Sequence, residues 1–141
     1  MDTKKNFLLI APKNPLGVES SFPPLGLATI ASHIPENYNV QIIDEGKGDV
    51  DLDNVSADIV GISANTLTAR RAYDISFYFM GKGIPTILGG IHPTVVPEEA
   101  KNYATSIVSG NGEPVMEELL LDFENGGLKK IYSPAIFDIA Q

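Results

Sequence analysis

The stretch Ile59-Val60-Gly61-Ile62-Ser63-Ala64-Asn65-Thr66 decides the fold, because a short apolar run passes directly into small and polar residues. A run that is nearly continuous in hydrophobicity, instead of alternating, is typical of a strand buried on both faces of a parallel sheet. Similar runs recur along the chain, each bounded by Gly, Pro, Asn, Asp or Ser. The other four are Phe7–Ala11, Val40–Ile43, Thr86–Leu88 and Ile107–Val108.

Three of the intervals between these runs carry apolar residues at helical spacing. The first helix is expected to follow Pro24 and to end at Pro35, and the second begins at Thr66 or Thr68. The third is expected to end at Gly126. The core-facing positions are Leu27, Ile30, Ala31 and Ile34 in the first helix, Ala72, Ile75, Ser76 and Phe79 in the second, and Met116, Leu119, Leu120 and Phe123 in the third.

Strands that alternate with helices in this way predict an α/β fold of three layers. We expect a flavodoxin-like (Rossmann-like) doubly wound domain with a five-stranded parallel sheet in the order 2-1-3-4-5. Residues 45–54 are rich in Gly and Asp and hold at most one helical turn, whereas Pro97–Ala100 predicts a short helix. Residues 1–127 would form the domain. The pattern is lost in residues 128–141, which predicts a linker or the start of a connection to another domain.

The composition excludes several classes of protein. A chain of 141 residues fits one domain, and its net charge of −8 has the wrong sign for DNA or RNA as a partner. The absence of cysteine excludes disulfides, thiolate zinc sites and cysteine-ligated iron–sulfur clusters from this stretch. No apolar run approaches the ~18–20 residues that a membrane span needs. We therefore expect a cytoplasmic protein.

The loops that follow the strands are the candidate site, because ligands of open α/β sheets bind at the carboxyl ends of the strands. Small residues crowd these loops, which lets a ligand approach the backbone closely. Ordinary tight turns are the alternative for any single loop, but several such loops at one edge favour a ligand groove. The candidate binding residues are Pro15, Leu16, Gly17, Ser63, Ala64, Asn65, Thr66, Gly89, Gly90, His92, Pro93, Gly110, Asn111, Gly112 and Glu113.

Several familiar sites of this architecture are missing. A phosphoacceptor site needs acidic residues after the first and third strands, where the chain has Ala11-Pro12 and Ser63-Ala64. The pair Gly110 and Gly112 supplies only two glycines of a dinucleotide fingerprint, and it follows the fifth strand instead of the first. Neither a P-loop nor a nucleophile elbow occurs. We expect no catalytic residue and no metal ligand in this chain.

Five motifs taken together carry a resemblance to a known family. They are Pro23-Pro24-Leu25-Gly26-Leu27, Val60-Gly61-Ile62-Ser63 through Thr66, Leu88-Gly89-Gly90-Ile91-His92-Pro93-Thr94, Pro97-Glu98-Glu99 and Gly110-Asn111-Gly112-Glu113. Over residues 6–125 the chain resembles the cobalamin-binding domain found N-terminal to many radical S-adenosylmethionine enzymes. That family includes anaerobic magnesium-protoporphyrin IX monomethyl ester oxidative cyclases and methyltransferases that act on unactivated carbon.

The resemblance implies how the groove would be used. The long nucleotide tail of cobalamin would thread a groove beside the sheet while the corrin disc covers the strand ends. Gly89 and Gly90 would lie beside the tail, and Ser63 with Thr66 would donate hydrogen bonds to it. The last motif of the family is usually Gly-Glu-Gly-Glu, and Asn111 replaces its first Glu here. Gly90→Val should harm ligand binding more than stability, because a β-branched side chain would occupy the groove while the loop lies at the surface.

The histidines bear on the cobalt. The Asp-x-His-x-x-Gly motif by which other cobalamin domains ligate the cobalt is absent after the first strand, so we expect bound cobalamin to be base-off with no protein histidine ligand. His33 is expected at the surface. For His92, a hydrogen bond to the loop backbone is the simplest role, and contact with the ligand is the alternative.

The resemblance implies that chemistry happens elsewhere. The chain would hold the corrinoid for methyl transfer or oxidative cyclisation, carried out with a following C-terminal radical S-adenosylmethionine domain. That barrel domain would carry the iron–sulfur cluster and S-adenosylmethionine. The alternative is a non-catalytic ligand-binding or interaction module of the same fold without bound cobalamin.

Overall fold

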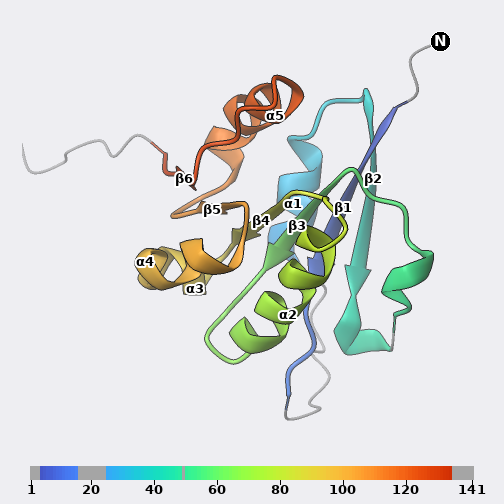
Figure 1. Ribbon diagram of the computed structural model, residues 1–141, viewed down its shortest axis with the longest axis vertical. Helices are drawn as coiled ribbons and strands as arrows, with labels where there is room; N and C mark the ends of the chain where they lie inside the picture. The colour runs from blue at the N-terminus through green and yellow to red at the C-terminus, as the bar shows by residue number, and fades with distance from the viewer. Residues whose placement is uncertain (1–3, 16–24, 49, 135–141) are drawn as a thin grey trace, which may run out of the picture.

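The computed structural model describes residues 4–15, 25–48 and 50–134. The expectations for Leu16, Gly17 and Pro24 lie outside the described residues. The described chain forms one parallel sheet in the order β2-β1-β3-β4-β5-β6, with β2 and β6 at its edges (Figure 1). The strands are β1 (Lys5–Ala11), β2 (Tyr38–Asp44), β3 (Ile59–Ser63), β4 (Thr86–Gly89), β5 (Ser106–Val108) and β6 (Ile131–Tyr132).

The predicted doubly wound fold with the order 2-1-3-4-5 is confirmed, because β1 pairs with both β2 and β3 and the later strands follow in sequence order. The interior strands are buried on both faces, as their continuous apolar runs predict. The second strand is different: Val40 and Ile42 are 37% and 38% exposed. This strand lies at the edge of the sheet, where helices cover it less completely.

Helices cover both faces of the sheet and complete the three predicted layers (Figure 1). The helices α1 (Leu25–Ser32) and α5 (Met116–Glu124) pack on the face to which Phe7 and Leu9 point. The helix α2 (Ala69–Met80) packs on the opposite face against Leu8 and Ile10. Successive side chains of β1 thus divide between two separate cores, as the pleat of a strand requires.

The helix α2 buries all four residues predicted to face the core, which are Ala72, Ile75, Ser76 and Phe79. It begins after Thr68, but the Thr68 hydroxyl does not cap it. That hydroxyl instead accepts a hydrogen bond from the Asn65 backbone N–H at 3.0 Å. The helix ends at Gly81, and α1 ends before Pro35 as expected.

Short helical turns fill several connections. Two 3-10 turns, η1 (Glu45–Lys47) and η2 (Leu52–Asn54), occupy the interval that predicted at most one turn. The sequence did not predict the short helix α3 (Ile91–Val95) directly after Gly90. Its Pro93 lies in the first turn, where the missing N–H would have no partner within the helix. The remaining elements are α4 (Pro97–Ala100), which was predicted, η3 (Lys101–Tyr103) and η4 (Glu113–Val115), which leads into α5.

The sixth strand extends the predicted five-stranded sheet. Ile131 and Tyr132 pair in parallel with Ile107 and Val108 of β5, in a segment that the sequence predicted as a linker. The Tyr132 ring is buried in the core beneath α5, and its hydroxyl donates to Asp122 Oδ2 at 2.6 Å. The same hydroxyl accepts from the Lys129 backbone N–H at 2.9 Å. A strand of two residues is too short to produce a recognisable pattern.

No helix in the described part of the chain is both long and apolar enough to cross a membrane.

The role of β6 can be tested with Tyr132→Ala. Tyr132 is 2% exposed and Ile131, beside it, is 37% exposed. Removing a buried aromatic ring should lower the free energy of unfolding by about 3–5 kcal/mol, measured by urea denaturation. The matched control Ile131→Ala should have a much smaller effect. Equal losses in the two variants would contradict the packing of β6 as part of the domain.

Candidate functional site

A cavity of about 210 Å³ lies on the α1 and α5 face of the sheet. It runs from the core to the carboxyl ends of the central strands, where Ser63 ends β3 and Gly89 ends β4. Its inner wall is apolar and is lined by Phe7, Leu9, Gly26, Leu27, Ile30, Gly61, Ile62, Ile87, Val108 and Met116. Its mouth is formed by Ser63, Gly89, Gly90, Gly110, Asn111, Gly112 and Glu113, all of which the sequence had singled out.

The cavity is open at this edge because Gly89 has no side chain. Strand residues two apart face the same side of a sheet, so Ile87 and Gly89 of β4 both face α1 and α5. The Ile87 side chain packs in the core on this face of the sheet, whereas a Cβ atom on Gly89 would meet nothing within 4 Å. A side chain at this position would therefore occupy the cavity.

Gly90 has a different role from Gly89. Its φ of +104° and ψ of −165° lie in a region open essentially to glycine alone. A Cβ atom there would lie 2.8 Å from the Ala64 carbonyl oxygen. The expectation that Gly90→Val would harm binding more than stability is therefore wrong, because the backbone conformation and the close approach to Ala64 both require glycine.

Gly112 allows the loop after β5 to approach α1. A Cβ atom on Gly112 would lie 2.7 Å from Cδ1 of Ile30. The first turn of the loop thus closes one side of the cavity, and η4 brings Met116 into the wall.

The other candidate residues do not line the cavity in the described part of the chain. Ala64 is buried at the start of the loop after β3, and Pro93 is buried in α3. The Asn65 side chain accepts from the Thr68 N–H at 2.9 Å, which closes a local turn. Thr66 and Pro15 are exposed at the surface.

Sequence reasoning missed the inner wall, because its residues are ordinary core residues by type. Alternation within a strand could have identified one of them. Ile87 precedes Gly89 by two positions within β4 and therefore faces the same side of the sheet, and Val108, the last residue of β5, belongs to the same core cluster as Ile87. The residues contributed by α1 had no comparable signal.

His92 is held by side chains on the α2 side of the sheet. Its Nε2 lies 2.7 Å from the Tyr73 hydroxyl and 3.1 Å from Glu99 Oε2, and Tyr73 donates to the same oxygen at 2.8 Å. These hydrogen bonds lower the pKa of Glu99, whereas burial and the hydrogen bond to Glu99 raise the pKa of Tyr73. The expected bond to the loop backbone is made instead by the backbone N–H of His92, which donates to the Ala64 carbonyl at 3.0 Å.

Comparison with known families identifies the family to which the chain belongs. Residues 16–120 match the family described as the B12 binding domain. The chain belongs to the B12-binding domain family. The matched range contains every mouth residue of the cavity, from Ser63 to Glu113.

Curated relatives and a solved structure agree with this assignment. The chain is 34% identical over 135 residues to bacteriochlorophyllide d C-12(1)-methyltransferase of Chlorobaculum tepidum, covering 92% of this chain and 30% of the relative. It is 34% identical over 113 residues to bacteriochlorophyllide d C-8(2)-methyltransferase of the same organism, covering 80% and 25%. An uncharacterized methyltransferase of Pyrococcus horikoshii is 31% identical over 115 residues, covering 73% and 25%.

The fold also matches a structure of the cobalamin-dependent S-adenosylmethionine radical enzyme OxsB with aqua-cobalamin bound. The TM-score is 0.69 at 20% identity, and the match covers 89% of this chain and 19% of that one. The B12-binding domain described here thus spans less than a third of the length of each of these proteins.

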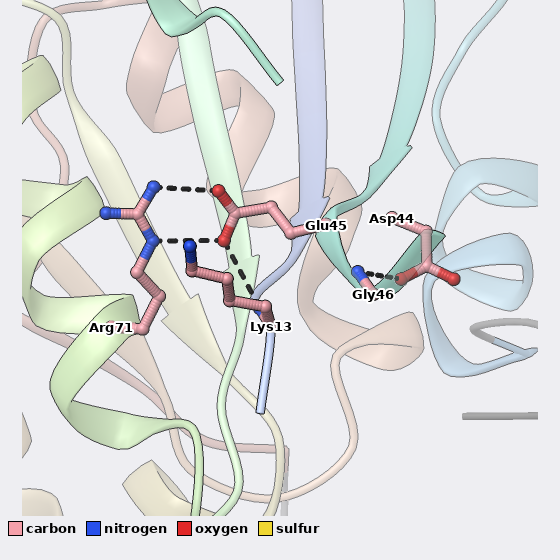
Figure 2. A network of polar contacts seen from close by, with 5 residues as sticks. All are labelled: Lys13, Asp44, Glu45, Gly46 and Arg71. Carbon is pink, nitrogen blue, oxygen red and sulfur yellow. Dashed lines mark hydrogen bonds and ion pairs between the residues drawn. The ribbon is translucent and has the colours of Figure 1, made fainter. Parts of the chain in front are cut away.

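An ion pair between the buried carboxylate of Glu45 and the partly exposed Arg71 holds the loop that follows β1 of this B12-binding domain. Arg71 of α2 donates to the Glu45 carboxylate through Nε at 3.1 Å and through Nη2 at 2.8 Å. The backbone N–H of Lys13 donates to the same carboxylate at 3.2 Å, so three elements meet at Glu45 (Figure 2). The Glu45 side chain is only 4% exposed, whereas that of Arg71 is 33% exposed.

The ion pair makes part of the stability depend on pH. Burial alone would raise the pKa of Glu45, but the hydrogen bonds from Arg71 and Lys13 outweigh it and lower that pKa. A carboxyl whose pKa is lower in the folded than in the unfolded chain stabilises the fold above its unfolded pKa of ~4.3. This contribution is lost as the pH falls through the folded pKa.

Glu45→Gln should remove this contribution. At pH 7 we expect the free energy of unfolding to fall by about 1–2 kcal/mol, because two charge-assisted hydrogen bonds weaken while water partly screens Arg71. Below about pH 5 the difference from the wild type should shrink as Glu45 itself becomes protonated. Urea denaturation at pH 7 and pH 4 measures both effects.

The control is Glu36→Gln, because Glu36 is exposed in the turn before β2. It should change stability little at either pH. A Glu45→Gln loss that is the same at pH 7 and pH 4 would show that the carboxylate charge has no part in holding the loop.

Proposed function

We propose that this chain binds cobalamin as the B12-binding domain of a radical S-adenosylmethionine methyltransferase. The observation that carries the proposal is the cavity that opens beside Gly89 at the carboxyl edge of the sheet. Membership of the B12-binding family supports it, as do relatives whose names describe methyltransferases.

The size of the cavity fits one part of cobalamin. Pockets that enclose a whole drug-sized ligand measure ~300–1,000 Å³, and this cavity of about 210 Å³ is smaller. Cobalamin consists of a wide corrin disc and a long nucleotide tail that ends in a flat heterocycle. We propose that the heterocycle at the end of the tail occupies the cavity, and that the disc lies outside it against the loops at the carboxyl edge.

The residues of the chain would bind and orient the cofactor. The apolar wall would hold the heterocycle, the space beside Gly89 would admit the tail, and the Ser63 hydroxyl could donate a hydrogen bond to it at the mouth. Thr66 and Pro15, exposed on neighbouring loops, would face the disc. The ion pair of Glu45 and Arg71 would hold the loop after β1, through the Lys13 backbone N–H, in place beneath that disc.

Cobalamin supplies methyl-carrying chemistry when it is bound, and this chain contributes the binding. We propose methyl transfer in preference to oxidative cyclisation, since the names of the relatives are those of methyltransferases. The iron–sulfur cluster and S-adenosylmethionine would belong to a separate radical S-adenosylmethionine domain. The alternative, a binding or interaction module without cobalamin, predicts no affinity for a corrinoid.

Calorimetric titration of the chain with aquacobalamin distinguishes the cobalamin-binding domain from the module without cobalamin. We expect saturable binding by the wild type and at least tenfold weaker binding by Gly89→Val, because the new side chain fills the cavity. The unfolding free energy of Gly89→Val should stay close to that of the wild type. Gly90→Ala is the contrasting variant, and strain at its φ of +104° should cost about 1–3 kcal/mol of stability.

Two results would contradict the proposal. One is a folded wild type, checked by circular dichroism, that shows no saturable binding of aquacobalamin. The other is a Gly89→Val variant that binds as tightly as the wild type, because the cavity would then not hold the ligand.

We also propose that the cobalt has no histidine on its lower face. A tail held in the cavity removes the cofactor's own benzimidazole from the cobalt. The His92 ring is bound to Tyr73 and Glu99 outside the cavity, and His33 lies exposed after the end of α1. Residues 12–21, which follow β1, contain no histidine in the sequence.

Electron paramagnetic resonance of the bound cob(II)alamin form tests this arrangement. We expect no superhyperfine splitting from an axial nitrogen, in the wild type or in His92→Ala. A splitting that disappears in His92→Ala would show that the ring leaves Tyr73 and Glu99 to ligate the cobalt. A splitting that persists in this variant would indicate that the benzimidazole remains on the cobalt.

A further inference from the structure

We infer that the cavity selects corrinoids by the chemistry of their lower base, accepting a benzimidazole and disfavouring a purine. This inference rests on the proposed function, because it requires the nucleotide tail to occupy the cavity. It goes further in naming the class of cofactor that the chain accepts.

The inner wall offers no polar side chain to the base. Among the described residues, the inner lining consists of glycines and of aliphatic, aromatic and methionine side chains, contributed by four strands and two helices. Six of these side chains belong to one buried core cluster. They are Phe7, Leu9, Leu27, Ile87, Val108 and Met116.

The polar groups near the cavity are either at its mouth or already paired. Ser63, Asn111 and Glu113 lie at the mouth, where the tail would enter. The strands β1, β3, β4 and β5, which line the wall, each pair in parallel with their neighbours in the sheet, so their backbone N–H and C=O groups are used in hydrogen bonds between strands. In the described part of the chain, every buried side-chain nitrogen or oxygen already has a hydrogen-bond partner. None of these atoms is therefore left for a buried base to bind.

The two kinds of base differ in what they require of such a wall. Dimethylbenzimidazole presents a benzene ring with two methyl groups, which an apolar wall can surround without loss. Adenine presents ring nitrogens and an exocyclic amine, which would leave their hydrogen bonds with water. Burying polar groups without new partners is unfavourable, so the wall should discriminate against adenine.

Three corrinoids test the inference by calorimetric titration of the wild-type chain. They are aquacobalamin, the corresponding cobamide with adenine as lower base, and aquacobinamide, which has no base. We expect the adenine cobamide and the cobinamide each to bind at least tenfold more weakly than cobalamin. A tenfold difference in affinity corresponds to about 1.4 kcal/mol of binding free energy.

Two variants introduce a hydrogen-bonding group into the wall. Ile30→Gln is compatible with α1, because Ile30 is only half-buried and Gln is a good helix former. Val108→Thr adds a hydroxyl to a side chain of nearly the same shape in β5. Each variant should reduce the ratio of the affinity for cobalamin to the affinity for the adenine cobamide. Leu121→Gln, on the exposed side of α5, is the control and should leave the preference unchanged.

The outcomes separate this inference from the proposed function. If none of the corrinoids binds, the proposed function fails. If cobalamin and the adenine cobamide bind equally, or cobinamide binds as tightly as cobalamin, the inference is overturned while cobalamin binding stands. A preference that is unchanged in both wall variants, with folding intact by circular dichroism, also overturns it.

Discussion

The close approach of Gly90 to the backbone of Ala64 is the contact on which the carboxyl edge of the sheet depends. Ala64 donates through its N–H to the Gly89 carbonyl at 2.8 Å and accepts from the His92 N–H at 3.0 Å. These bonds hold α3 against the loop after β3. The Thr94 hydroxyl then donates to the Gly90 carbonyl and accepts from the Gly110 N–H, both at 2.8 Å. The ends of three strands are thereby linked through one short helix.

This contact separates the roles of the paired glycines. Gly90 is required by the backbone, because any side chain there would meet the Ala64 carbonyl. Gly89, held in regular strand geometry beside it, keeps the cavity open. The same two-residue motif therefore serves both the fold and the site. Substitutions at the two positions must be interpreted by different measurements, stability for Gly90 and ligand affinity for Gly89.

The features that depend on local periodicity and composition could be predicted from the sequence. The interior strands, the helix α2 and the strand order follow from apolar runs and helical spacing, and the mouth of the cavity follows from small residues after successive strands. Contacts between distant segments were not predictable in this way. The partners of His92 come from α2 and α4, and β6 is held by a pairing of two residues and by the burial of Tyr132. Neither leaves a local pattern in the chain.

The strand-end loops are anchored mainly from the α2 side of the sheet. Arg71 binds Glu45, which in turn holds the loop after β1 at Lys13, and Tyr73, two residues further along the same helix, holds the ring of His92. The opposite face needs no charged group for this purpose, so its wall can remain apolar up to the mouth. Because a charge in that wall would be unfavourable for an apolar base, the placement of the ionic contacts on one face is what leaves the other face suited to a heterocycle.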